Sequence, residues 1–269
     1  MQDYSKTNWL SLKIIMFFLL VVFIAYLPVS SFLFSLKNDA FNGYFPPKFF
    51  MSESLHQGQL PLWNPYINYG YPLYGDMSAG YWSPITWLIS ATVGYNVYTY
   101  TLETLLYILL SGIGLFVLGQ SIGLKQNFAV MAGVVYMCCG FQVGHLQHLN
   151  WLSAAAFLPS CLWAYLKLFK GFSFKNILIA ALVFYLFLSS AHPGLIIGGF
   201  YFFIFLTIFL FLKKENRTKL KSRNLYFCLG LFIIILLLLS AAMLAGYADI
   251  LPHFVRAEKL SINNVATHS

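Results

Sequence analysis

The chain has 269 residues, of which 59% are apolar and only 9% are charged. Soluble domains need about a quarter charged residues to cover their surface, so this composition excludes a soluble globular protein. The net charge of +8 would suit a nucleic-acid partner, but six of the 16 basic residues fall in one short stretch, 213–223, between two apolar runs. Basic loops of that kind orient membrane proteins. The sequence therefore predicts a protein whose partner is membrane lipid and not nucleic acid.

Long apolar runs with few charges predict about seven membrane-spanning helices. The first run is too long for the apolar core of a signal peptide, so we expect an uncleaved span, kinked at Pro28. The predicted fold is an all-α, polytopic transmembrane bundle that forms one membrane domain over 1–269. It divides into 1–36 (N-terminus and first span), 37–94 (a long loop), 95–246 (six further spans) and 247–269 (a tail). The predicted spans are 14–36, 97–119, 127–143, 151–168, 176–191, 194–212 and 225–246.

Basic residues are distributed unequally between the two sides that this scheme defines. Twelve of the 16 lie on the side of the N-terminus and four on the other side. By the positive-inside rule the N-terminus is cytoplasmic, and the 37–94 loop and the tail are external. All six histidines fall on the external side together with Asp39 and Asp76. We therefore expect any chemistry that uses charge to take place outside the cytoplasm.

The external loop 37–94 holds six of the ten prolines and three of the six tryptophans of the chain. Aromatic rings with one polar atom suit the headgroup layer of a membrane. Pro46 and Gly58 bound a predicted short interfacial helix, amphipathic with Lys48, Glu53 and Gln57 on its polar face. A second short helix is predicted near Pro84. The irregular segment between the two helices is a place where a polar substrate could be held.

Several motifs in the loop are distinctive. They are an acidic residue just after the first span, Tyr-Phe-Pro at 44–46, Gly-x-Leu-Pro-Leu-Trp-Asn-Pro at 58–65, Gly-Tyr-Pro at 70–72 and Ser-Pro at 83–84. With 140–159 and Ala-His-Pro-Gly at 191–194, these motifs resemble the bacterial multi-spanning membrane family known as YfhO. The resemblance covers most of the chain. Members of that family continue into further spans, so the resemblance implies that this chain is an N-terminal portion.

The resemblance also implies a function. YfhO-type proteins look like glycosyltransferases of the GT-C type, which take a sugar from a polyprenyl-phosphate carrier on the external face of the bacterial cytoplasmic membrane. Their acceptors are cell-envelope polymers such as lipoteichoic acid. GT-C enzymes carry an essential acidic residue in the first external loop, and Asp39 occupies the matching place. The resemblance thus implies Asp39 as the catalytic carboxylate.

The residues themselves leave alternatives open for both carboxylates. Asp39 suits a base that takes the proton of an acceptor hydroxyl, or it is a solvated carboxylate at a helix end. Asp76 is either a second carboxylate of the site or a turn former. If both face one pocket, they would also suit a divalent cation. No other cofactor is indicated.

His145 and His148 are three residues apart, so they would share one face if this segment is helical. Two histidines without a third ligand do not make a metal site, so we expect either an edge that binds sugar or phosphate, or a plain interfacial turn. His192 is expected to contact the carrier phosphate or to be a satisfied helix-end residue. Glu103, inside the second span, marks a cavity wall or an interhelical bond. The loop motifs add Tyr44, Trp63 and Asn64 to the predicted substrate-binding set.

Two other classes of protein compete with a glycosyltransferase. A transporter or flippase of a lipid-linked sugar would place polar residues through the membrane midplane, whereas here they gather on one side. A non-catalytic scaffold of an envelope assembly would bind its partners without transferring a sugar.

Overall fold

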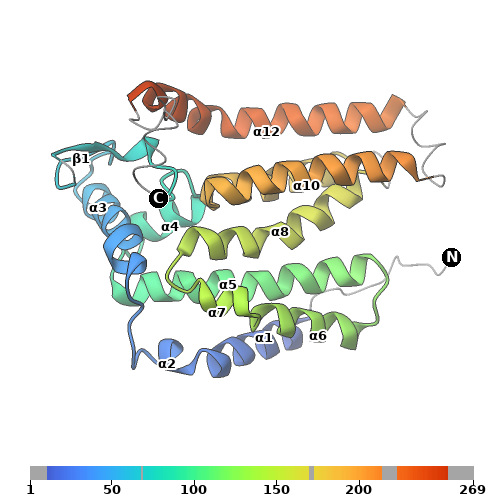
Figure 1. Ribbon diagram of the computed structural model, residues 1–269, viewed down its shortest axis with the longest axis horizontal. Coiled ribbons are helices and arrows are strands. Elements are labelled where there is room, and N and C mark those ends of the chain that lie inside the picture. Colours follow the sequence, from blue (N-terminus) through green and yellow to red (C-terminus); the bar gives the residue numbers. More distant parts are fainter. Residues whose placement is uncertain (1–10, 68, 170–172, 214–222, 254–269) are drawn as a thin grey trace, which may run out of the picture.

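The computed structural model describes residues 11–67, 69–169, 173–213 and 223–253. Within these ranges the protein is an all-α bundle with one two-stranded hairpin, and its long helices run side by side (Figure 1). Most of the basic stretch 213–223 and of the tail 247–269 lies outside the described residues. The helices are α1 (Leu12–Ala25), α2 (Leu27–Ser30), α3 (Phe45–His56), α4 (Pro84–Ala91), α5 (Val97–Ser121), α6 (Gln126–Met137), α7 (Gly140–Gly144), α8 (Leu149–Leu168), α9 (Phe174–Ser190), α10 (Pro193–Leu212) and α12 (Arg223–Ile250).

In the part of the chain that the structure describes, five helical segments are long and apolar enough to cross a membrane. The other two predicted spans correspond to shorter apolar helices, α1 with 14 residues and α9 with 17. The first predicted span does not form one helix: α1 ends at Ala25, and the single turn α2 follows with Pro28 in it. The five long segments are α5, Gln126–Gly144, α8, α10 and Arg223–His253.

Helix α5 lies inside the bundle and packs against α1, α6 and α8. It begins with a capping box, in which the Asn96 side chain accepts hydrogen bonds from the amides of Tyr98 and Thr99. Small residues let the helices approach closely, as is common in membrane bundles. A Cβ added at Gly133 of α6 would lie 2.8 Å from the carbonyl oxygen of Gly112 on α5.

The two ends of the bundle differ in chemistry. One end carries α3, α4, the hairpin and the junctions α7–α8 and α9–α10 (Figure 1). The other end carries the α5–α6 turn, the last turns of α8 and α10 and the start of α12 (Figure 1). The described basic residues of that second end are Lys125, Lys167, Lys175, Lys213 and Arg223. We call the first end the capped end.

The segment 37–94 forms the cap. Residues Ala40–Tyr44 make one π-helical turn (η1) that runs directly into α3. The strands β1 (Trp63–Asn64) and β2 (Tyr71–Pro72) pair antiparallel, with Trp63 opposite Pro72. A 3-10 turn (η2, Leu73–Gly75) follows, and after it comes α4. Helix α3 begins with Pro46 and Pro47 in its first turn and ends before Gly58, whose φ of +71° suits glycine.

The polar face predicted for α3 is confirmed at Glu53 and Gln57, which are exposed, and is wrong at Lys48. Lys48 was expected on an exposed polar face but is 3% exposed, whereas the apolar Phe49 is 44% exposed. The reason is a buried partner, since the Lys48 ammonium lies 3.0 Å from the carboxylate of Glu103 on α5. An ion pair outweighs the hydrophobic pattern of a short helix because a lysine can be buried when its charge is compensated.

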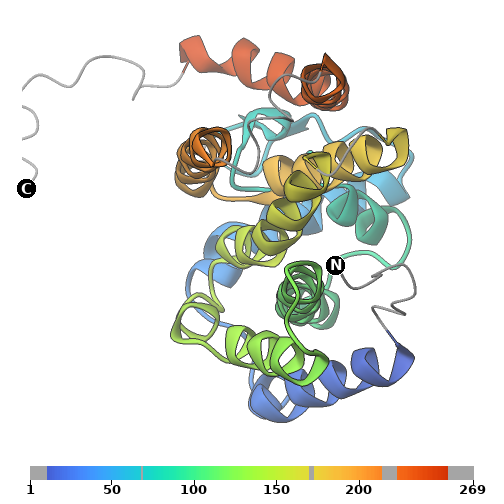
Figure 2. The same cartoon turned by 90° about the vertical axis from the view of Figure 1, so that its right-hand side faces the viewer.

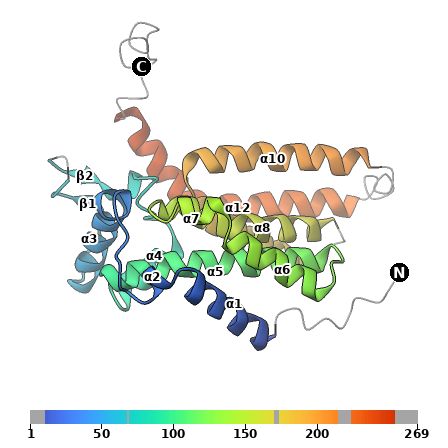
Figure 3. The ribbon, with the colours of Figure 1, turned by 60° about the horizontal axis from the view of Figure 1, so that its bottom comes forward.

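Helix α12 closes the cap from the other side. Its C-terminal turns leave the direction of the rest of the helix (Figures 2 and 3) and contact η2. Gly75 makes this approach feasible, because a Cβ there would lie 2.4 Å from the Ile250 side chain. In addition, the hydroxyl of Tyr74 donates a hydrogen bond of 2.7 Å to Asp249. The cap is therefore anchored to the bundle at two places, to α5 through the Lys48–Glu103 pair and to α12 through η2.

Candidate functional site

Asp39 and two histidines meet at the capped end. Asp39 directly precedes η1, and its carboxylate oxygen Oδ2 lies 3.1 Å from Nε2 of His148. The Nδ1 atom of His148 in turn lies 3.1 Å from Nδ1 of His145. The Asp39 side chain is 61% exposed and that of His148 22% exposed. The three side chains thus form a hydrogen-bonded chain that opens to the outside of the bundle.

His145 and His148 are not in one helix, and the alternative of a turn describes their position. They lie in the turn between α7 and α8, where the amide of His148 bonds to the carbonyl of His145. The rings still meet, because the turn folds the two residues back on each other. Spacing alone could suggest their proximity but not the loop geometry that produces it.

The hydrogen bonds fix the tautomers when both imidazoles are neutral. The carboxylate only accepts hydrogen bonds, so Nε2 of His148 carries the proton and its Nδ1 accepts from Nδ1–H of His145. The free Nε2 of His145 is then an acceptor. Burial, together with the neighbouring His148, lowers the pKa of His145 below its ordinary value and favours this neutral form.

Trp151 connects the histidine pair to His192. Its ring stacks on His145 with 4.6 Å between ring centroids, and its centroid lies 5.0 Å from that of His192. His192 caps α10, where its Nδ1 accepts a hydrogen bond from the amide of Gly194. Its Nε2 therefore carries a proton in the neutral ring and can donate it. Burial, with a smaller contribution from His148, lowers the pKa of His192.

Tyr44 and Asp76 belong to the same region of the cap. The pKa of Tyr44 is raised by burial and then by the negative charges of Asp39 and Asp76. Asp76 accepts hydrogen bonds from the amides of Ser78 and Ala79, so the turn-former interpretation of this residue fits its contacts. Burial raises the pKa of Asp76, and these two amides oppose the rise.

Glu103 has a partner in the protein interior. Its carboxylate pairs with Lys48 and accepts hydrogen bonds from the hydroxyls of Tyr95 (2.8 Å) and Tyr107 (3.2 Å). The sequence left open whether Glu103 lines a cavity or bonds to another helix, and the structure shows a bond between α5 and α3. A cavity of about 10 Å³, the room of about one water molecule, separates Lys48 from Asn150.

Asn150 is a polar residue that the sequence analysis did not select. Its side chain is buried and acts on the Tyr44 hydroxyl, where it opposes the rise of the Tyr44 pKa. Its backbone oxygen accepts the amide of His192 and so ties α8 to the start of α10. Trp151 was missed as well, although the spacing of three residues from His145 to His148 to Trp151 could have indicated it.

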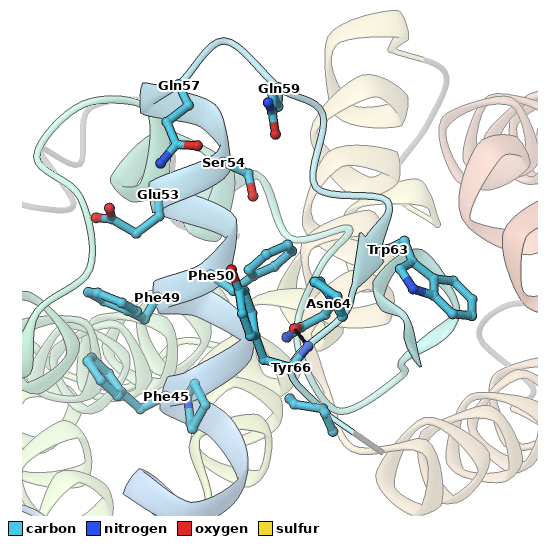
Figure 4. Close-up of a pocket in the computed structure, with 13 residues that line it drawn as sticks. Phe45, Phe49, Phe50, Glu53, Ser54, Gln57, Gln59, Trp63, Asn64 and Tyr66 are labelled. Atoms are coloured by element: carbon cyan, nitrogen blue, oxygen red, sulfur yellow. Dashed lines mark hydrogen bonds between the residues drawn. The ribbon is translucent and has the colours of Figure 1, made fainter. Parts of the chain in front are cut away.

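Trp63 and Asn64 lie apart from the Asp39 site, in a groove of about 750 Å³ between α3 and the segment 59–67 (Figure 4). Asn64 is 2% exposed, and its side-chain oxygen accepts the amide of Tyr66. The Trp63 side chain points away from α3 (Figure 4). The predicted substrate-binding residues therefore divide into an outer site around Asp39, a buried ion pair and a separate groove.

Metal ligands are not assembled in the part of the chain that the structure describes. Within it, no group of three or more histidine, cysteine, aspartate or glutamate side chains could hold a metal ion. The Asp39–His148–His145 chain is instead arranged for proton exchange and for hydrogen bonding to a polar ligand.

No family model, curated protein sequence or solved structure matches the chain.

Proposed function

We propose that the protein is a membrane glycosyltransferase of the GT-C type, which transfers a sugar from a polyprenyl-phosphate carrier to a cell-envelope acceptor at the capped end. The observation that carries the proposal is the hydrogen-bonded chain from Asp39 through His148 to His145. A carboxylate held by an imidazole, at the end of an apolar bundle, suits a lipid-linked substrate whose reactive group lies at the membrane surface.

The roles of the residues follow from their hydrogen bonds. The Asp39 carboxylate accepts the proton of the acceptor hydroxyl while that oxygen forms a bond to the anomeric carbon of the sugar. The bond from the anomeric carbon to the carrier phosphate breaks, and the phosphate leaves with the electron pair. His148 donates a hydrogen bond to the carboxylate and holds it in its orientation. The Nε2–H of His192 is a donor for the phosphate oxygen on which negative charge develops.

The proposed orientation places the capped end outside the bacterial cytoplasmic membrane and the N-terminus in the cytoplasm. The charges support it, because the described basic residues of the opposite end match the positive-inside rule. A transporter of a lipid-linked sugar is less well supported, since the polar cluster lies at one end of the bundle and not along its length.

The test compares two carboxylates of the capped end in the purified full-length chain, reconstituted in lipid nanodiscs. A tritiated sugar on polyprenyl phosphate is the donor and an envelope extract is the acceptor. We expect Asp39→Asn to lower transfer at least about a hundredfold. The matched control is Asp249→Asn, which also removes an exposed carboxylate with one side-chain partner and should keep full activity. Equal transfer by Asp39→Asn and the unmodified chain would remove Asp39 from the mechanism.

A further inference from the structure

The groove beside α3 differs from the Asp39 site in the chemistry of its lining. Its lining combines aromatic side chains and uncharged polar groups, and the described lining contains one carboxylate, Glu53, and no lysine, arginine or histidine. Its volume of about 750 Å³ falls in the range of ligand sites in proteins. The described lining residues are Phe45, Pro46, Phe49, Phe50, Glu53, Ser54, Gln57, Gln59, Trp63, Asn64, Pro65, Tyr66 and Ile67.

Helix α3 presents opposite faces to the bundle and to the groove. Lys48, Met51 and Ser52 are buried against the bundle, and the Lys48–Glu103 ion pair fixes the rotation of the helix. Because residues four apart lie on one face of a helix, Phe49, Glu53 and the neighbouring groove residues are turned outward together. The exposed rings on α3 are thus a consequence of how the helix is anchored.

The opposite wall is also held in place. The amide of Tyr66 bonds to the side-chain oxygen of Asn64, which itself is buried. The ring of Tyr66 lies against Phe50 in an edge-to-face contact with 6.0 Å between centroids (Figure 4). Tyr66 is nevertheless 85% exposed, so most of its surface is available to a ligand.

We propose that this groove binds a neutral saccharide chain of the acceptor. Pyranose rings carry C–H bonds that pack on aromatic faces, here Phe49 and Tyr66, and hydroxyl groups that pair with amides and carboxylates, here Gln57 and Glu53. A phosphate-bearing ligand would need cationic groups, which the described lining lacks, and it would be repelled by Glu53. The chemistry therefore selects an uncharged polyol over an anionic polymer or an anionic lipid headgroup.

The groove is separate from the proposed reaction centre, but helix α3 connects the two along the chain. Asp39, η1 and α3 follow one helical path, and Phe45, at the start of the groove, is six residues after Asp39. Only the single π-helical turn η1 lies between Asp39 and Phe45. A saccharide in the groove would therefore extend along α3 with one end toward Asp39. This inference rests on the proposed function, and it names the class of acceptor.

The experiment measures binding to the reconstituted full-length chain without a donor. The probes are maltohexaose, cellohexaose and chitohexaose as neutral chains, and hexagalacturonate as an anionic chain of equal length. We expect at least one neutral chain to bind and hexagalacturonate to bind at least about fivefold more weakly. Phe49→Ala and Tyr66→Ala should each weaken the neutral chain about tenfold, and Glu53→Gln should reduce the discrimination against hexagalacturonate. The control Tyr69→Asn changes an exposed aromatic residue of the same loop outside the lining and should have no effect.

Three results would overturn the inference. They are no binding of any neutral chain at millimolar concentration, equal binding of hexagalacturonate, or loss of binding in none of the groove variants. A further control tests for lipid in the groove. The Trp63 signal is the difference in fluorescence between the unmodified chain and Trp63→Phe. If brominated phospholipid quenches this signal and added saccharide does not restore it, lipid occupies the groove. Binding and catalysis are separable, because Asp39→Asn should bind saccharide normally. Saccharide binding without any sugar transfer by the unmodified chain would refute the proposed function and leave the groove, whereas transfer without saccharide binding would refute the groove alone.

Discussion

Lys48 and Glu103 form a buried ion pair with 3.0 Å between Nζ and Oε1, and it joins the cap to the central helix α5. The Lys48 ammonium also donates to the hydroxyls of Thr86 and Tyr95. Both charges are almost inaccessible, so each depends on the other for compensation. The groove face of α3 and the start of η1 are oriented by this contact, although neither residue lies at the surface.

Replacing Glu103 alone should be severely destabilising. In Glu103→Gln the buried ammonium loses its counter-charge, and breaking a buried pair in this way costs about 3–5 kcal/mol. The double variant Lys48→Met, Glu103→Leu removes both charges and should recover most of that loss. Unfolding of the purified chain in mixed detergent micelles measures both. A single variant as stable as the unmodified chain would mean that the pair is not buried.

Packing of α5 against α6 should depend on Gly133. A side chain there would meet the backbone of Gly112 and the ring of Phe18, and backbone cannot move aside easily. Gly133→Val should therefore lower the unfolding free energy by about 1–3 kcal/mol. Gly230→Ala is the matched control in α12, because a Cβ there meets nothing within 4 Å. The same detergent unfolding curves compare the two, and equal stability would contradict the close approach.

The stability of the capped end should fall in mild acid. The pKa values of His145 and His192 are lowered in the folded protein, so the unfolded chain binds more protons as the pH drops below about 6.5. The contribution of the two neutral histidines to the free energy of unfolding is intact above that pH. It is lost as the pH falls toward their lowered pKa values. Thermal unfolding between pH 7.5 and pH 5 measures it. His145→Gln together with His192→Asn, which retains a capping side chain at α10, should flatten the dependence; an unchanged slope in this variant would place the acid sensitivity elsewhere.

The sequence predicts the apolar helices and the helical parts of the cap well, because their signals are local. Pro46 at the start of α3 and Pro84 at the start of α4 are examples. The burial of Lys48 could not be predicted, since its partner is 55 residues away and the residues around it read as an exposed face. The distance between Asp39 and the pair Trp63 and Asn64 could not be predicted either, because the hairpin that sets it depends on contacts that are not local in sequence. The meeting of Asp39 with His148, 109 residues apart, was predicted only as a shared side of the membrane.

The central claim is that Asp39 and His148 act together in sugar transfer. The most direct measurement is a double-mutant cycle on the transfer rate of the reconstituted chain, with Asp39→Asn, His148→Gln and both changes together. Residues that act as a unit are not additive, so the double variant should be no slower than Asp39→Asn, while His148→Gln alone should lose at least about tenfold. Undiminished transfer by Asp39→Asn, or losses that multiply in the double variant, would contradict the account.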